Sequence, residues 1–549
     1  MFIYLDKLCE RLKQSEKFSI YGSGYYGQLI YAKLCTLGWK DRIESFIVTK
    51  KDAQQAYING VEIIEFDASC FENTNTMILV GVGKEYRQEI AHHIGDRLGK
   101  QIIFLCDYFD TDEQQRDILL KGTFEELCQY VVDQYIFENP LLLGNKSELL
   151  AELENTVREH QKMSREDRLL VYVMEEETAR SVKILCALRQ AGYQIKVLQD
   201  IRKSGYVARQ ELTELGIEIV EFDGLYTFLI NSLKYKPLLY HIESMWFNFY
   251  YAIIAIRHNE LWGKTVFAPQ EILKGSFINI PENTFIYEKY CLENADGIVW
   301  RYFSKEYLEK KWGYVYKGES IQLLDNCSGY LLKKREMRLL EEKLKICCVV
   351  SHIDSFLAPS NENCFTRQAR FEDILNKLDD SCIFDVYAWH VGADSERQLK
   401  ELEQKYAFFR VFKKVNHEEL IQRISEYDYG TDIFTNEKIP AYPLGAETIG
   451  YGYLCTEGSY RYSVANRYFD YIDAELPVIT TLPEKLCEYL KQYHVIVEMN
   501  SNNLDIAYLK ANKKYYQKKA REAKQKLLMS NHINLLTGLY EKISNSIME

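Results

Sequence analysis

The sequence lacks the features that mark several large classes of protein. It has 14 Cys in 549 residues but no Cys-x-x-Cys pair, so no spacing suits a zinc site and free thiols are expected. Its longest apolar stretch, 246–256, is well short of the roughly 20 residues that span a bilayer. The net charge of −12 gives no overall attraction to nucleic acid. Charged residues follow Met1 closely, unlike a secretory leader, so we expect a cytoplasmic protein.

What is present is the pattern of an α/β protein. Hydrophobic residues make up 47% of the chain and charged residues 27%, which is a globular composition. Short apolar runs such as "TMILVGVG" (76–83) alternate with segments of helical spacing, which predicts parallel sheets. The pattern starts near residue 18 and restarts at "RLLVYVM" (168–174) and "ICCVVSHI" (346–353).

These restarts predict three Rossmann-like units in an α/β fold. Two facing sheets would enclose an interdomain cleft, where small molecules bind beyond the carboxyl ends of the strands. The predicted domains are an N-terminal Rossmann-like module (1–110), a helical connector (111–167), two further α/β domains (168–330 and 331–503) and C-terminal helices (504–549).

The segment "NRYFDYIDAELPVITT" (466–481) predicts a helix, a proline and a short strand. Helical spacing places Tyr468 and Phe469 on the core face and Asp470 on another face. Asn466 could cap the helix, whose N-terminus would favour a diphosphate while Asp470 accepts hydrogen bonds from ribose hydroxyls. The alternative is that Asn466 is only a cap and Asp470 a solvated surface residue.

The same segment resembles the "FEY-x-AAG-x-PVI" signature of GT-B glycosyltransferases, especially the retaining family 4-type group. Three other segments resemble motifs of that family in the same order along 168–545: "ENADGIVWRYFSKEYL" (293–308), "WHVG" (389–392) and "VNHEELIQRISEYDYGTDIF" (415–434). The resemblance implies that the last two α/β domains form a GT-B pair, with the acceptor bound by 168–330 and the donor by 331–503.

The resemblance also implies a reaction. A sugar would move from a nucleotide-diphosphate sugar to a hydroxyl of a glycan, glycolipid or protein, with retention of configuration and no cofactor or metal, in bacterial surface glycan or glycoconjugate synthesis. Two alternatives stay open. One is an inactive GT-B scaffold that binds a partner, and the other is an NAD-dependent sugar-nucleotide enzyme.

Donor-site residues follow from the family's motif positions. Asp470 takes the place of the ribose-binding acid, and Ser463 stands where the family has its first motif acid. Lys413 lies where the nucleotide base packs. The remaining donor-site candidates are three phosphate-binding arginines and the neighbours of Asp470 in the motif: Arg367, Arg461, Arg467, Asn466 and Tyr468.

Acceptor-side candidates follow predicted strands of the 168–330 domain. His241 and Glu243 are candidate catalytic residues, since a His at a strand end can act as a base. A structural, hydrogen-bonded His is the alternative. Other polar side chains that could line the acceptor side are Glu175, Gln270 and Glu271.

Two further patterns carry weaker predictions. Gly22, Gly24 and Gly27 form a Gly-x-Gly-x-x-Gly turn, but no acid closes the next strand, which disfavours NAD. That region resembles a small Rossmann-like module of bacterial surface-sugar enzymes, and tight packing without a ligand is an alternative. The basic run 510–526 could touch anionic lipid at the inner membrane face or be a solvated surface.

Overall fold

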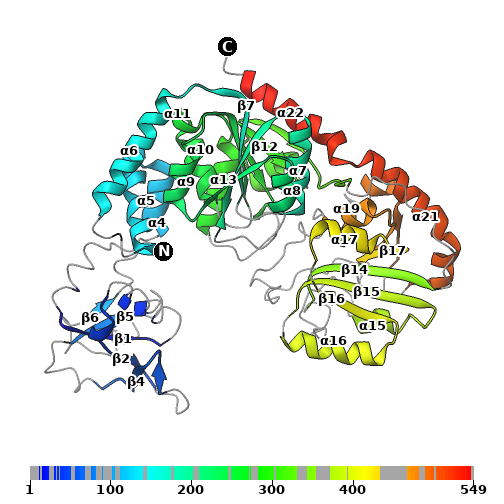
Figure 1. The fold of residues 1–549 in the computed structure, drawn as a ribbon, viewed down its shortest axis with the longest axis horizontal. Coiled ribbons are helices and arrows are strands. Elements are labelled where there is room, and N and C mark those ends of the chain that lie inside the picture. Colours follow the sequence, from blue (N-terminus) through cyan, green and yellow to red (C-terminus); the bar gives the residue numbers. More distant parts are fainter. Residues whose placement is uncertain are drawn as a thin grey trace. The chain divides into compact units, whose positions relative to one another are not determined.

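The computed structural model forms two compact units, Met1–Lys162 with Gly224–Lys234, and Met163–Asp223 with Tyr235–Glu549. Figure 1 shows the elements of both units. The described residues are parts of 12–50, then 56–67, 76–81, 90, 102–104, 112–139, 142, 145–174, 178–201, 209–244, 249–270, 272–273, 282–301, 305–329, 343–353, 371–391, 393–413, 415–432, 466–480, 489–499 and 503–545.

The first unit contains a six-stranded sheet of order β3-β4-β2-β1-β5-β6, parallel except for the β3–β4 pair. Its strands are β1 (Lys17–Tyr21), β2 (Ile43–Val48), β3 (Tyr57–Ile58), β4 (Val61–Glu65), β5 (Thr76–Val80) and β6 (Ile102–Phe104), with a short helix η1 (Lys40–Arg42). The unit's helices are α4 (Asp112–Lys121), α5 (Phe124–Glu138), α6 (Lys146–Lys162) and α9 (Leu225–Ser232). Thr123 begins α5 with a capping box, which fixes the start of that helix.

The second unit holds two fully parallel sheets, and the first of them has seven strands in the order β13-β12-β11-β10-β7-β8-β9. Its strands are β7 (Glu166–Met174), β8 (Gln194–Asp200), β9 (Glu218–Phe222), β10 (Pro237–Ser244), β11 (Thr265–Pro269), β12 (Gly297–Trp300) and β13 (Glu319–Gln322). The helices connected to them are α7 (Ala179–Gln190), α8 (Arg209–Glu214), α10 (Tyr250–Arg257), α11 (Asn259–Trp262), α13 (Glu282–Asn294) and α14 (Lys305–Trp312).

The other sheet of the second unit has six strands in the order β16-β15-β14-β17-β18-β19. Its strands are β14 (Leu344–His352), β15 (Cys382–His390), β16 (Phe409–Lys413), β17 (Tyr429–Asp432), β18 (Val478–Thr480) and β19 (Ile496–Val497). Four of the helices described in this region are α15 (Phe371–Leu375), α16 (Ala393–Lys405), α17 (His417–Ile424) and α19 (Asn466–Asp473).

Two consecutive C-terminal helices join the cores of these two sheets. Helix α21 (Ile506–Lys526) packs on the β14–β19 sheet, where Leu509 is buried and its carbonyl accepts a 2.8 Å bond from the Tyr429 hydroxyl. Helix α22 (Met529–Asn545) instead buries Leu536 and Tyr540 in the core of the β7–β13 sheet (Figure 1, red). The end of the chain therefore ties both sheets of the second unit together.

The predicted α/β class with three Rossmann-like parallel sheets is confirmed. The sequence analysis missed β3, β13 and β19, which have two, four and two residues and are too short to show a period. The predicted domain boundaries and the cleft stay predictions.

Candidate donor site

Helix α19 begins at the point where the strand order of the β14–β19 sheet reverses. Strand β14 is flanked by β15 and β17, which lie on opposite sides of it. Nη1 of Arg467 donates a 3.0 Å bond to the Val349 carbonyl of β14. The Tyr471 hydroxyl accepts a 2.7 Å bond from the Val349 amide and donates a 2.9 Å bond to the Thr431 carbonyl of β17. Open parallel sheets bind ligands at such switch points, beyond the carboxyl ends of their strands.

The local sequence explains how α19 is seated there. The helix predicted at 466 is confirmed, and Tyr468, Phe469 and Ile472 are buried as expected. Gly430 allows the close approach, because a Cβ at that position would lie 2.3 Å from the Tyr471 ring. The chain then turns through Glu475, at a φ of 62°, and Pro477 precedes β18. The helix is thus pinned on β14 and β17 by its aromatic face.

Asp470 is buried and paired, not solvated. Its Oδ1 accepts a 3.0 Å bond from Lys183 Nζ and lies 3.0 Å from His417 Nε2. Within the described part of the chain, its Oδ2 has no partner. Burial alone would raise the pKa of this carboxyl, but the charges of Lys183 and His417 and their hydrogen bonds hold that pKa well below its usual value. The surface alternative for Asp470 is therefore wrong, and the carboxylate stays ionised.

Two more oxygens near α19 have no donor among the residues that the structure describes. Asp432, at the end of β17, is 1% exposed; its Oδ2 accepts a 2.7 Å bond from the Tyr468 hydroxyl, whereas its Oδ1 has no partner. Oδ1 of Asn466 also has no partner in the described ranges, so no capping bond from Asn466 to α19 is seen there. Asn466 and Asp470 lie one turn apart on the same helix face. Acceptor oxygens without donors are costly when buried, and a ligand rich in hydroxyl groups would satisfy them.

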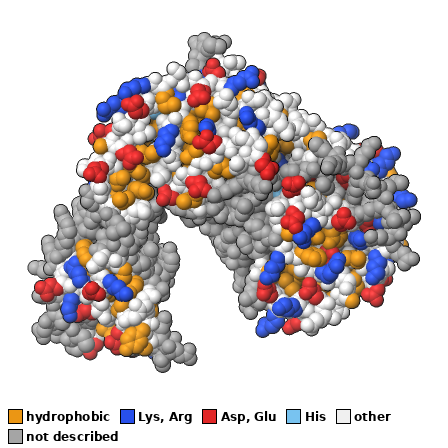
Figure 2. Space-filling view, in the orientation of Figure 1, with side chains coloured by type: hydrophobic (Ala, Val, Ile, Leu, Met, Phe, Trp, Pro, Cys, Tyr) orange, Lys and Arg blue, Asp and Glu red, His pale blue; other side chains and the backbone are white. Residues whose placement is uncertain are grey.

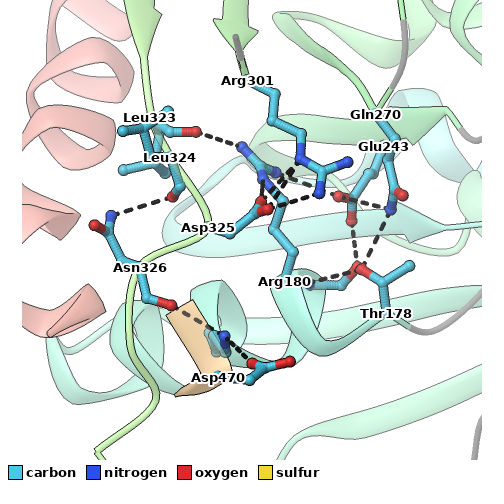
Figure 3. A network of polar contacts seen from close by, with 12 residues as sticks. Thr178, Arg180, Glu243, Gln270, Arg301, Leu323, Leu324, Asp325, Asn326 and Asp470 are labelled. Carbon is cyan, nitrogen blue, oxygen red and sulfur yellow. Dashed lines mark hydrogen bonds and ion pairs between the residues drawn. The ribbon is translucent and has the colours of Figure 1, made fainter. Parts of the chain in front are cut away.

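The switch point of the β7–β13 sheet is built differently. At the carboxyl end of β10, Oε2 of Glu243 accepts bonds from the Tyr172 hydroxyl (2.8 Å) and the Ser181 hydroxyl (2.6 Å). Its Oε1 accepts bonds from Gln270 Nε2 (3.1 Å) and Arg180 Nη1 (3.4 Å). Figure 3 shows Glu243 and Gln270 facing the start of α7. Both oxygens of this predicted catalytic acid are occupied by the protein itself.

The network continues into the segment that follows β13. Asp325 is fully buried and lies between two arginines, with Arg180 Nε 3.0 Å from its Oδ1 and Arg301 Nη2 2.6 Å from its Oδ2 (Figure 3). Arg180 Nη2 also donates to the Leu323 carbonyl at 2.9 Å. Two arginines and two carboxylates balance each other here, so the cluster is an electrically neutral brace.

His241 lies in the core of the β7–β13 sheet. Its ring stacks on Tyr172 at 4.5 Å between centroids, and its Nδ1 lies 2.7 Å from the Tyr540 hydroxyl of α22. Burial, and then the charge of Arg180, lowers the pKa of His241 to about 3. This placement favours the structural alternative over contact with an acceptor, and the catalytic role stays a prediction.

Other predicted residues are not brought to α19 or lie outside the described residues. Lys413 ends β16, is exposed and forms a 2.8 Å ion pair with Glu396. The candidates outside the described residues are Glu175, Glu271, Arg367, Arg461, Ser463 and Gly24. Sequence reasoning missed Asp432, although an acid that ends a predicted strand was a usable signal. It also missed Lys183 and His417, which no local pattern connects to Asp470.

The N-terminal glycines pack a helix closely on β1. Gly22 has a φ of 105°, and a Cβ on Gly27 would lie 1.7 Å from the Gly22 carbonyl oxygen. Glu44, the acid nearest the expected dinucleotide spacing, lies at the amino end of β2, where it pairs with Lys17 at 2.5 Å and accepts from Thr76 at 2.7 Å. These contacts favour the packing alternative for this turn.

No protein-family model matches the chain, and no curated protein matches it in sequence. Solved structures are similar to it at low identity. The E. coli trehalose-6-phosphate structure bound with UDP-2-fluoro glucose is 13% identical over 68% of this chain and 99% of its own, with a TM-score of 0.40. The α,α-trehalose 6-phosphate synthase of Burkholderia multivorans is 9% identical over 70% and 99%, with a TM-score of 0.39.

The wall teichoic acid polymerase TagF is 9% identical over 77% of this chain and 98% of its own, with a TM-score of 0.40. All three TM-scores are below 0.5, so the function proposed below rests on the contacts of this chain. Among the described helices, none has both the length and the apolar character needed to cross a membrane.

Proposed function

We propose that this protein is a glycosyltransferase that binds a nucleotide-diphosphate sugar at α19 and transfers the sugar to a hydroxyl acceptor. The proposal rests on three side-chain oxygens at one switch point that no described residue donates to: Asp432 Oδ1, Asn466 Oδ1 and Asp470 Oδ2. The ribose and the sugar of such a donor both present hydroxyl groups to acceptors of this kind. The resemblance of 466–481 to the GT-B family 4-type signature supports the same ligand.

The roles at this site follow from charge and position. Asp470 is held ionised and accepts ribose hydroxyls through Oδ2, a bond to a charged group worth roughly 1.5–3 kcal/mol. Arg467 Nη2 and the amides of the first turn of α19 would face the diphosphate and stabilise the charge that develops as it leaves. Retention of configuration and independence from metal are part of this proposal. The acceptor is a glycan, glycolipid or protein hydroxyl held by the β7–β13 sheet.

A binding screen tests the proposal. UDP-glucose, UDP-N-acetylglucosamine, GDP-mannose and ADP-glucose are compared by thermal shift, since a ligand of the native state raises Tm. We expect at least one to bind, and Asp470→Asn to weaken it ten- to a hundredfold in calorimetry, at about 1.4 kcal/mol per decade. Asp380→Asn, an exposed acid of the β14–β19 half of the unit, is the matched control and should bind like the parent.

The possible results separate the alternatives. No Tm shift with any of the four sugars, or equal binding by Asp470→Asn, would refute a donor site at α19. Binding without slow release of free nucleotide, with or without glycan acceptors, would identify the inactive scaffold.

We also propose that the protein works at the inner face of a membrane. The exposed side of α21 carries Tyr508 and Tyr515, which are 41% and 49% exposed, and the exposed lysines Lys510, Lys514 and Lys518. Figure 2 shows Lys and Arg side chains over α21 at the right of the view. Lysines beside interfacial tyrosines suit an anionic lipid surface that holds a glycolipid acceptor.

A further inference from the structure

A lysine of the β7–β13 sheet reaches the proposed ribose carboxylate of the β14–β19 sheet. Lys183, on the first turns of α7, is 0% exposed in its side chain, and its Nζ lies 3.0 Å from Asp470 Oδ1. The same Nζ donates a 3.0 Å bond to the Asn326 carbonyl, in the segment that joins the two sheets. Burial lowers the pKa of Lys183, but the nearby charges of Asp470 and Asp473 outweigh it, so the ammonium is charged.

The geometry of this pair differs from that of the purely bracing carboxylates. Asp473, which also lies on α19, uses both oxygens: Oδ2 accepts a 2.8 Å bond from the Ser328 amide and Oδ1 a 3.1 Å bond from the Gly329 amide. At Asp470, by contrast, Lys183 and His417 both approach Oδ1. Two donors on one oxygen fix the rotation of the carboxylate and leave its other oxygen open.

We infer that Lys183 is a positioning residue for the donor: it holds Asp470 by Oδ1 so that Oδ2 faces the ribose hydroxyls of the nucleotide sugar. This inference rests on the proposed function. Its consequence is that donor affinity depends on a residue of the opposite sheet, so the donor site is complete only when the two sheets are in contact.

Several charged or titratable groups lie around Asp470, and two of them, Lys183 and His417, contact it directly. Lys183 approaches from α7 and His417 from α17, while Asp473 lies on α19 itself. Asp325 and Cys327 lie in the joining segment, and Lys524 of α21 is 3.8 Å from Asp473. In a variant without Lys183, His417 would be the one remaining hydrogen-bond partner that lowers the pKa of Asp470. Burial would then raise that pKa. Donor binding should then weaken as the solution becomes acidic.

The test uses the full chain and the nucleotide sugar that gives the largest Tm shift in the screen above. Its Kd is measured at about pH 8 and about pH 5.5 for the parent, Lys183→Met, Lys183→Arg, Asp470→Asn and the Lys183→Met/Asp470→Asn double variant. We expect a similar Kd at both pH values for the parent. Lys183→Met should bind at least tenfold more weakly at pH 8 and more weakly still at pH 5.5. Lys183→Arg should recover part of the affinity, and the double variant should lose no more than Asp470→Asn.

Lys524→Met is the matched control, because Lys524 is equally buried but its ion pairs are with Asp473 and Glu475. It should lower stability and leave the Kd and its pH dependence unchanged. If Lys183→Met folds and binds like the parent while Asp470→Asn binds weakly, the inference is wrong but the proposed function is not. Parent-like binding by Asp470→Asn would overturn the proposed function instead. If Lys183→Met does not fold, parent-like affinity and pH dependence of His417→Gln, which removes the other donor to Oδ1, would overturn the inference.

Discussion

The two switch points of the second unit use similar residues to opposite effect. At β7 and β10, both oxygens of Glu243 and of Asp325 are occupied by protein donors. At the switch point between β14 and β17, Asp432 and the α19 residue Asp470 each keep one oxygen that has no donor in the part of the chain that is described. A carboxylate whose oxygens all have protein donors stabilises the fold and has no oxygen left for a ligand; we call such a site closed. A buried carboxylate with an oxygen that has no donor costs stability unless a ligand donates to it, and we call such a site open.

From this difference we infer a structural role for the β7–β10 switch point and a binding role for the β14–β17 switch point. The Glu243–Arg180–Asp325–Arg301 brace holds α7 and the joining segment in place, and α7 in turn carries Lys183 to Asp470. The β7–β13 switch point therefore supports the donor site from a distance. The predictions below test that division, starting with the largest expected effect.

Breaking the closed network should cost stability. Arg180→Met leaves Asp325 and Glu243 with fewer partners in a buried site, so we expect a loss of about 3–5 kcal/mol in the free energy of unfolding. Urea unfolding followed by tryptophan fluorescence measures it. Arg189→Met, an exposed position on the same helix, is the control and should lose less than about 1 kcal/mol. A small loss for Arg180→Met would mean that the brace does not stabilise the unit.

The sequence predicted the local structure around α19 but not its contacts with distant residues, for a physical reason. Helix α19, its buried aromatic face and the strand after Pro477 follow from local spacing, and the same segment made Asp470 a candidate, whose role stays a prediction. The pairing of Asp470 with Lys183 joins residues 287 positions apart, and no periodicity reports a contact of that kind. Glu243 and His241 contact α7 and α22, which their positions at a strand end did not indicate, and their catalytic role stays a prediction.

The buried histidine of the closed sheet should make the fold sensitive to acid. The folded-state pKa of His241 is about 3, against an ordinary value of 6.5, so below pH 6.5 the unfolded chain takes up a proton that the native state does not. Stability should fall as the pH falls from 6.5 towards 3, by up to roughly 2 kcal/mol at about pH 5. Asp470 contributes in a separate, lower window, because its lowered pKa loses its stabilising effect only below the usual carboxyl range.

His241→Phe keeps a ring against Tyr172 and removes the titration. Plots of unfolding free energy between about pH 7 and pH 5 should therefore be flatter for this variant than for the parent, whatever its absolute stability. His532→Phe, which changes a histidine outside the core cluster on α22, should keep the slope of the parent. An unchanged slope for His241→Phe would place the proton uptake elsewhere.

The smallest expected effect concerns α21, which carries a lysine in an ion pair beside a lysine without one. Lys513 forms a 2.7 Å ion pair with Asp428, whereas the neighbouring Lys514 is exposed and has no partner in the described part of the chain. A lysine near an anionic surface contributes about 1 kcal/mol, so Lys514→Gln should weaken binding to phosphatidylglycerol-containing vesicles about fivefold at low salt. Lys513→Gln should change it far less, because that charge is already neutralised.

Co-sedimentation measures both variants, and binding should vanish in about 0.5 M salt, where screening shortens the reach of surface charges to a few ångströms. Binding that persists at that salt concentration, or to vesicles of phosphatidylcholine alone, would show that the lysines of α21 do not make the contact.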